Sequence, residues 1–211
     1  MKRVARSNLI EELKLFPYFN KDQILQLGKR KESYNLKHST IDTYISRFLK
    51  EKKIIPLKNG VYVTSDFYNK HKGNTSYLFY LANILRKPSY ISSWTALQYY
   101  NLATEVIHTI TSVTPKITRS HKTKIGTFSY QSIKKDLFSD FILTKDKFEF
   151  FIATPSKALF DLLYFKTQQF RGLKFEDIDF LMKELRIDVV EMGDKEQEKF
   201  YSMINNYIQH E

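Results

Sequence analysis

The stretch Ser39–Thr64 reads STIDTYISRFLKEKKIIPLKNGVYVT, and its pattern changes part-way along. From Ile41 to Leu49, apolar residues recur at helical spacing with polar and basic residues between them. Two short apolar runs then flank Asn59-Gly60, a dipeptide typical of tight hairpin turns because it tolerates positive φ. The sequence therefore predicts an amphipathic helix that starts at Ser39 and runs directly into a β-hairpin.

Two further helices are expected upstream, over residues 7–15 and from Asn20 to a stop at Gly28. Asn20 and Gln23 have the spacing of a capping pair for the second of these helices. The basic segment 29–38 has no clear period and is interpreted as a loop. Three helices followed by a hairpin are typical of a winged helix-turn-helix, a unit whose common use is reading duplex DNA.

Such a unit presents short polar and basic side chains to base edges and cations to the phosphates. The candidates for base contact on the third helix are Thr40, Thr43, Ser46 and Arg47, next to Ser39 at its start. The candidates for phosphate contact are Lys37, Lys50, Lys58 and Asn59. The alternative is a small helical module that docks a protein partner through a solvated, charged face.

The charge of the chain favours a polyanionic partner. The 211 residues carry a formal net charge of +11. Residues 1–72 hold 16 Lys and Arg against 7 Asp and Glu, whereas residues 172–211 hold 5 against 10. The front of the chain is therefore basic and its end acidic.

The composition also excludes several classes of site. The chain has no cysteine, so disulfides, thiolate metal sites and cysteine nucleophiles are ruled out. The five histidines have no metal-ligand spacing, and Asp136, Asp140, Asp146 and Glu149 are expected to be turn and strand-edge acids. No cofactor is expected. Without a signal peptide or an apolar run of membrane-spanning length, a cytoplasmic protein is the expectation.

The rest of the chain predicts a mixed α/β domain over residues 75–211, after a winged helix-turn-helix in residues 1–70 and a polar boundary at Phe67–Ser76. The fold class is therefore α+β. Helices are expected over 75–87, from Ser92 or Ser93, from Pro155 with Thr154 as cap, over 175–185 and over 194–207. Strands are expected over 106–113 and 123–130, with a hairpin over 141–153 turning at 145–147.

Two features of this second domain call for partners. A second basic patch, made of Lys116, Arg119, Lys122 and Lys124 with His121, is placed between two strands and either follows a nucleic-acid backbone or is a solubilising loop. Asp161 lies inside an apolar helix, so its carboxylate needs a partner, for which Lys157 at i−4 is the candidate.

Three segments resemble the AbiEi-type antitoxins of type IV abortive-infection toxin–antitoxin systems. They are LKNGVYV in the hairpin, PSYISSWTALQYYNL at 88–102 and ATPSKALFDLLYF at 153–165, and the resemblance covers roughly residues 5–190. It assigns the C-terminal motif to Ser92, Lys157 and Asp161, together with Ala96, Leu97 and Ala158. Ser156 departs from the pattern, which usually has an acid before the lysine.

The resemblance implies a protein that binds inverted repeats in its own promoter and represses the operon. It also implies a functional partner, a nucleotidyltransferase-like toxin that the antitoxin counteracts without a stable complex. Two other hypotheses stay open from the residues alone. One is an RNA-binding module that stacks Tyr and Phe on unpaired bases, and the other is a metal-dependent nuclease, which needs convergent carboxylates.

Overall fold

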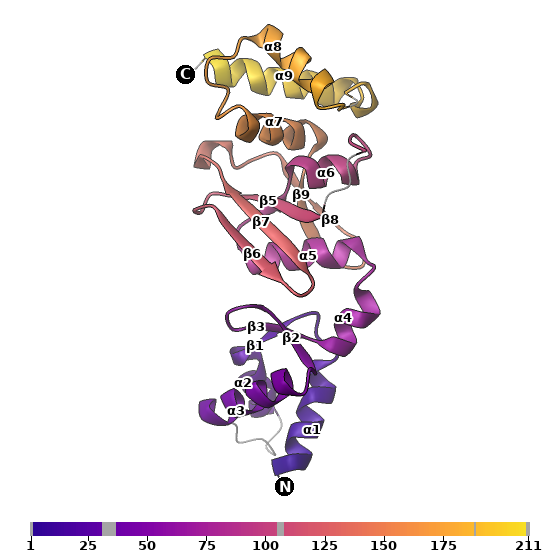
Figure 1. Ribbon diagram of the computed structural model, residues 1–211, viewed down its shortest axis with the longest axis vertical. Helices are drawn as coiled ribbons and strands as arrows, with labels where there is room; N and C mark the ends of the chain where they lie inside the picture. Colours follow the sequence, from indigo (N-terminus) through magenta and orange to yellow (C-terminus); the bar gives the residue numbers. More distant parts are fainter. Residues whose placement is uncertain (1, 31–36, 105–107, 188, 210–211) are drawn as a thin grey trace.

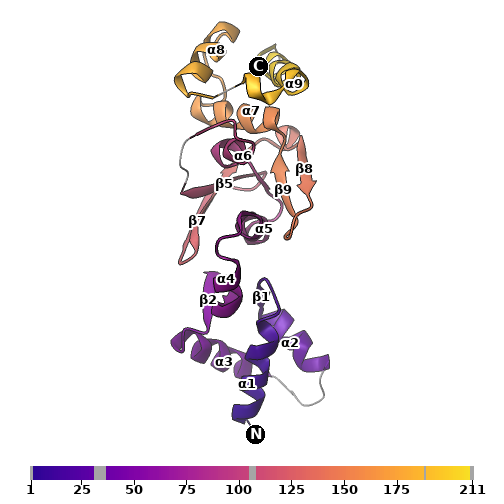
Figure 2. The same cartoon turned by 90° about the vertical axis from the view of Figure 1, so that its right-hand side faces the viewer.

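The computed structural model describes residues 2–30, 37–104, 108–187 and 189–209. These residues form a mixed α+β structure with two β-sheets, and the molecule is elongated, with its termini at opposite ends (Figure 1). An N-terminal unit, a six-stranded sheet and a helical layer follow one another along the long axis (Figures 1 and 2).

The N-terminal unit alternates helices with a small sheet. Its elements are α1 (Lys2–Leu13), β1 (Phe19–Asn20), α2 (Lys21–Arg30), α3 (His38–Lys50), β2 (Ile54–Lys58) and β3 (Val61–Thr64). The hairpin strands β2 and β3 pair antiparallel, and β1, which the sequence pattern did not reveal, joins as the third strand in the order β1-β3-β2. Pro56 therefore lies on an edge strand, as a residue without an N–H requires.

The predicted capping pair at the start of α2 is confirmed. The backbone N–H of Asn20 donates to the Gln23 side chain, and the N–H of Gln23 donates to the Asn20 side chain, both at 2.9 Å. The stop at Gly28 is wrong, because α2 continues to Arg30. Most of the basic segment expected as a loop, residues 31–36, lies outside the described residues.

Asn20→Ala is expected to lower the free energy of unfolding by about 1 kcal/mol, because one N–H at the start of α2 loses its acceptor. Urea unfolding followed by circular dichroism measures this. Asn205→Ala, on the exposed face of α9, is the matched control and should change stability by less than about 0.5 kcal/mol. Equal effects of the two substitutions would contradict the capping role.

The larger sheet has the order β6-β7-β5-β4-β9-β8 and mixes parallel with antiparallel pairs. Its strands are β4 (Tyr90–Ile91), β5 (Thr109–Thr114), β6 (Arg119–Thr123), β7 (Gly126–Ser132), β8 (Phe141–Thr144) and β9 (Phe150–Ala153). The hairpin expected over 141–153 is confirmed by the antiparallel β8–β9 pair. The strand expected over 123–130 is confirmed in its larger part by β7, which pairs with β6 in a second hairpin because Gly126 at φ +149 allows a tight turn between them.

Helices cover this sheet on both faces. The helix α5 (Thr75–Leu85) packs on the side of the N-terminal unit, whereas α6 (Ser93–Tyr99) and α7 (Pro155–Lys166) lie on the other side, and α8 (Phe175–Glu184) and α9 (Asp194–Gln209) form an outer layer (Figures 1 and 2). Two 3₁₀ turns, η1 (Lys135–Leu137) and η2 (Val190–Met192), complete the described elements. Thr154 caps α7, and all nine residues from Ser156 to Tyr164 are buried. Seven of them are apolar or small, and the other two, Lys157 and Asp161, form an ion pair that is described below.

The segment 67–76, expected as a polar boundary, is mostly helical. Helix α4 (Ser65–His71) occupies its first half, with His71 buried among Phe67, Tyr77 and Phe148. The buried side chains form two clusters, one drawn from residues 9–54 and one from residues 57–204. The packing therefore divides inside strand β2, earlier in the chain than residues 67–76.

The part of the β2–β3 hairpin from Leu57 onward belongs to the buried cluster drawn from residues 57–204. Leu57, Val61 and Val63 are buried there with side chains of α5 and the six-stranded sheet. Polar contacts join the same two parts, since the Tyr77 hydroxyl donates to the Pro17 carbonyl at 2.8 Å and Lys14 pairs with Asp66 at 2.8 Å. The hairpin thus packs against both parts of the molecule.

Candidate nucleic-acid interface

The outer face of α3 is exposed to solvent. Ile41, Tyr44, Ile45 and Phe48 turn inward and are buried. The residues predicted to meet DNA are exposed, apart from the half-buried Thr40; these are Lys37, Ser39, Thr43, Ser46, Arg47 and Lys50. No other part of the described chain covers this face.

The start of α3 differs from the prediction. The helix begins at His38 with Lys37 at the N-cap, so Ser39 lies in the first turn and does not cap it. Asp42, in the first half of α3, forms an ion pair with Lys21 at the start of α2. This exposed pair joins α2 to α3, whereas the buried side chains of Ile41, Tyr44, Ile45 and Phe48 determine which face of α3 points outward.

Some polar side chains on α3 are already engaged and others are not. The Thr43 hydroxyl donates to the Ser39 carbonyl at 2.9 Å, so only its acceptor lone pairs remain. Ser46, Arg47 and Lys50 form no hydrogen bond through their side chains and no ion pair with any described residue. Two cations in the last turn of a helix are therefore free to meet an anion from outside.

The hairpin turn supplies one exposed polar side chain, Asn59, beside Gly60 at φ +76. Lys58 was predicted to contact phosphate, but the structure gives it another role. Its ammonium donates to the Leu85 carbonyl at 2.7 Å, and burial together with Arg86 and Lys116 lowers its pKa. Lys58 therefore holds the hairpin to α5 through one of its three donors, and its contact with phosphate stays a prediction.

A group of cations at this junction was not singled out from the sequence. Arg86 donates to the Ile117 carbonyl and Lys116 donates to the Lys87 carbonyl, so both cations contact backbone oxygens. Burial, Lys58, Arg119 and Arg86 lower the pKa of His121. Arg86 and Lys87 follow directly after an apolar helix, and only the fold brings them to Lys58 and Lys116.

The second basic patch does not form one surface. It was expected between two strands, but Arg119, His121 and Lys122 lie within β6, and Lys124 lies in the turn after it. Arg119 and His121 oppose the buried residues Tyr130 and Phe128 and share their face, whereas Lys122 opposes Thr127 on the other face. Strand alternation therefore splits the patch.

The residues of the C-terminal motif come together inside the protein. The Lys157 ammonium lies 2.8 Å from one carboxylate oxygen of Asp161, as the i−4 spacing predicted. The Ser92 hydroxyl donates to the other oxygen at 2.7 Å and the Tyr90 hydroxyl at 3.0 Å. All four residues are at most 2% exposed.

This buried cluster links the sheet to helix α7. Burial raises the pKa of Asp161 against the opposing effects of Lys157, Ser92 and Tyr90, and burial raises the pKa of the Tyr90 phenol. Tyr90 was missed because it lies in a two-residue strand that leaves no periodic signal. The geometry is that of a structural polar core, since each of these residues is at most 2% exposed.

Ser156, the departure from the family pattern, is also satisfied. Its backbone N–H and its hydroxyl both donate to one oxygen of Glu196 on α9, at 3.0 and 2.7 Å. An acid therefore does contact the residue before Lys157, although it comes from a helix forty residues further along the chain.

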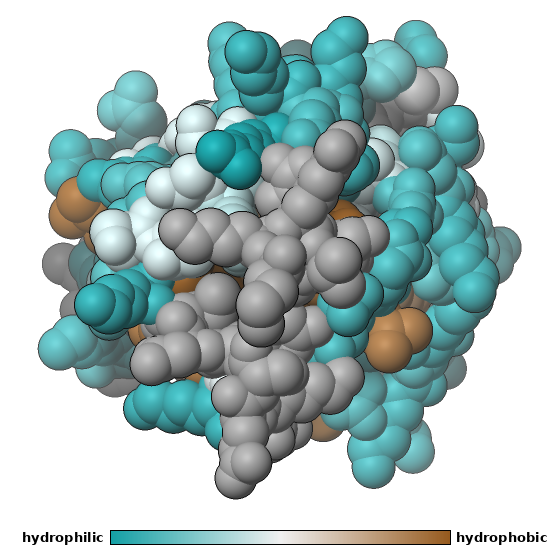
Figure 3. All heavy atoms as spheres, turned by 90° about the horizontal axis from the view of Figure 1, so that it is seen from below, coloured by the Kyte–Doolittle hydropathy of each residue, from teal (hydrophilic) through white to brown (hydrophobic). Residues whose placement is uncertain are grey.

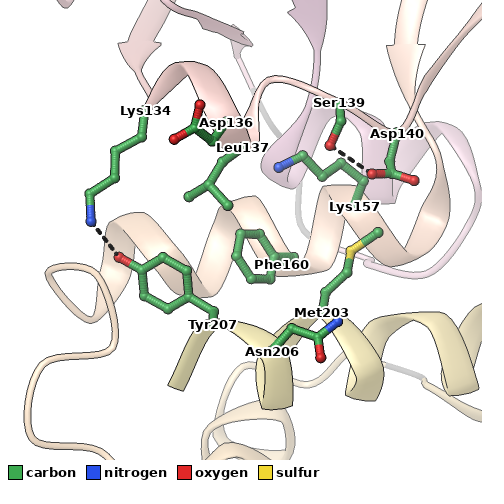
Figure 4. A pocket seen from close by; sticks show the side chains of 10 residues that line it. All are labelled: Lys134, Asp136, Leu137, Ser139, Asp140, Lys157, Phe160, Met203, Asn206 and Tyr207. Atoms are coloured by element: carbon green, nitrogen blue, oxygen red, sulfur yellow. Dashed lines mark hydrogen bonds between the residues drawn. The ribbon is translucent and has the colours of Figure 1, made fainter. Parts of the chain in front are cut away.

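A pocket of about 380 Å³ opens between η1, α7 and α9 (Figure 4). Lys157 and Phe160 line it from α7, and Met203, Asn206 and Tyr207 line it from α9. Asp136 and Asp140 also line this pocket, whereas Asp146 and Glu149 are exposed elsewhere. Within the described ranges, no three His, Asp or Glu side chains converge in a way that could hold a metal ion.

Among the described residues, each helix is too short or too polar to cross a lipid bilayer. Comparison of the sequence with models of known protein families finds no match. Comparison with curated proteins finds no match either.

Proposed function

We propose that this protein is a duplex-DNA-binding regulator whose N-terminal unit acts as a winged helix-turn-helix. The observation that carries the proposal is the outer face of α3, where Ser46, Arg47 and Lys50 are exposed and uncommitted. A helix of this kind enters the major groove with its polar face toward the base edges. The adjacent hairpin tip with Asn59 then meets the neighbouring phosphates.

The packing of the unit supports this proposal. Helix α3 is held by its buried face and by the Lys21–Asp42 pair, so docking needs no rearrangement of the helix. At the end of the molecule that carries this unit, the surface around the atoms drawn in grey is mainly hydrophilic, with a few apolar patches (Figure 3). A polar, basic surface of this kind suits a phosphate backbone better than the apolar core of a protein interface.

The resemblance to AbiEi-type antitoxins extends the proposal to the role of the protein in the cell. The protein then occupies inverted repeats in its own promoter, represses the operon and counteracts a nucleotidyltransferase-like toxin. The convergence of Ser92, Lys157 and Asp161 supports reading the motif as one unit. Because these residues are almost completely buried, we assign them to the architecture of the domain and not to contact with a protein or nucleic-acid partner.

Fluorescence anisotropy with labelled DNA tests the DNA-binding proposal. The full chain is titrated with the duplex upstream of its own gene, a scrambled duplex of the same length and the corresponding single strand. We expect tightest binding to the upstream duplex. Preference for the single strand would favour the RNA-binding alternative, and Mg²⁺-dependent cleavage of the probe would favour the nuclease.

Binding to the upstream duplex is expected to weaken steeply with salt. Each phosphate that a Lys or Arg neutralises contributes about −0.9 to the slope of log K against log[salt], so two such contacts by Lys37 and Lys50 give a slope of about −1.8. Titrations at a series of KCl concentrations measure the slope. A slope near zero would contradict docking against the phosphate backbone.

The antitoxin part of the proposal needs a separate experiment. The neighbouring gene is expressed alone and together with this chain, and growth is followed. We expect growth arrest by the neighbour to be relieved by co-expression, and arrest that persists would remove the antitoxin role while leaving DNA binding intact.

A further inference from the structure

The pocket between η1, α7 and α9 combines charges of both signs with an apolar wall. Leu137, Phe160 and Met203 form the apolar part, and the pocket volume of about 380 Å³ lies within the range of small-molecule sites. Figure 4 shows Lys157 on the same side of the pocket as Ser139 and Asp140, with Met203 and Asn206 on α9 opposite them.

Lys157 gives this pocket a cation at a buried position. The side chain is 2% exposed, and its ammonium lies 2.8 Å from Asp161 and 4.8 Å from the centre of the Phe160 ring. An ammonium carries three donors, and the carboxylate of Asp161 uses only one of them in the described structure. The remaining donors can serve a ligand acceptor that enters the pocket.

Two carboxylates lie nearer the surface of the same pocket. Asp136 is exposed and has no hydrogen-bond or ion-pair partner among the described residues, and Asp140 accepts a hydrogen bond from Ser139 at 2.7 Å. Lys134, the other cation of the pocket wall, is already engaged with the Tyr207 hydroxyl at 3.2 Å and with the Tyr207 ring. The charges open to a ligand are therefore an ammonium inside and carboxylates outside.

We propose that this pocket binds a free α-amino acid with an apolar side chain. Its carboxylate would meet the Lys157 ammonium, its own ammonium would meet Asp136 or Asp140, and its side chain would pack on Leu137, Phe160 and Met203. Hydrogen bonds between oppositely charged groups are the strong ones, and both ends of a zwitterion would make them here.

Ligands of a single charge fit less well. A phosphate or a simple carboxylate would meet Lys157 but would lie near Asp136 and Asp140, whereas a polyamine would meet the acids but would face Lys157. An uncharged apolar molecule would bury the ammonium and the carboxylates against a surface that cannot pair with them, which is unfavourable. The inference does not rest on DNA binding, because none of the pocket residues lies on α3 or the hairpin.

Isothermal titration calorimetry of the full chain tests the proposal. The probes are L-phenylalanine and L-leucine, with phenylacetate as an analogue lacking the ammonium and phenethylamine as an analogue lacking the carboxylate. We expect saturable binding of at least one amino acid, and binding of both analogues weaker than that of phenylalanine by about tenfold or more.

Matched variants locate the site. Asp136→Asn and Asp140→Asn are expected to weaken amino-acid binding by about tenfold, whereas Asp146→Asn, an exposed acid in the β8–β9 turn, should leave it unchanged. Asparagine tolerates the positive φ of Asp140, so both variants should unfold thermally like the wild type. The proposal is overturned if neither amino acid binds, if phenylacetate or inorganic phosphate binds as tightly, or if both pocket variants bind normally.

Discussion

Asp161→Ala is expected to lower the free energy of unfolding by about 3–5 kcal/mol, because it leaves the Lys157 ammonium buried without a counter-charge. The ammonium has little access to water, since the Lys157 side chain is 2% exposed. The substitution also removes the acceptor of the Ser92 and Tyr90 hydroxyls, which adds to the loss. Guanidinium unfolding monitored by fluorescence of Trp94 and by circular dichroism measures the effect.

Two control proteins separate the charge effect from other causes. Asp146→Ala removes an exposed acid and should change stability by less than about 0.5 kcal/mol. The double variant Lys157→Met with Asp161→Leu removes both charges, so it should be clearly more stable than Asp161→Ala alone. If Asp161→Ala cost no more than Asp146→Ala, the buried ion pair would have no structural role.

The i, i+4 spacing of Lys157 and Asp161 explains why this pair was predictable. Both residues lie in one helix that is otherwise apolar, and a buried carboxylate needs a nearby cation. Tyr90 and Glu196 were not predictable in the same way. They reach the cluster from a short strand and from the last helix, so only the tertiary structure joins them to Asp161 and Ser156.

On the surface, too, a feature within one helix was predictable, whereas features that depend on tertiary contacts were not. The exposed face of α3 follows from its helical period, because the positions of Ile41, Tyr44 and Phe48 define the buried side. The contact made by Lys58 and the division of the second basic patch were not predicted, because both depend on the tertiary structure. The sequence marks Lys58 as a turn cation, but the packing of the hairpin against α5 directs its ammonium to the Leu85 carbonyl.

Arg47→Ala is expected to weaken binding to the upstream duplex by about 1–3 kcal/mol if its guanidinium contacts a guanine edge. That corresponds to roughly a 5- to 150-fold rise in Kd. The side chain is exposed in the last turn of α3 and has no intramolecular partner in the described structure, so its removal should not unfold the protein. Fluorescence anisotropy on the upstream and scrambled duplexes measures both the affinity and the discrimination.

Two further variants distinguish a base contact from a phosphate contact. Lys50→Ala, one helical turn further along α3, should weaken binding to both duplexes alike and reduce the salt slope by about 1. Arg171→Ala removes an exposed arginine far from α3 along the chain and should leave both affinities unchanged. If Arg47→Ala also weakened the two duplexes equally, Arg47 would be a phosphate contact, and the specificity of α3 would have to come from Ser46, Thr43 and the shape of the DNA. If it left both affinities unchanged, Arg47 would lie outside the interface, and the docking of α3 in the groove would lose its main support.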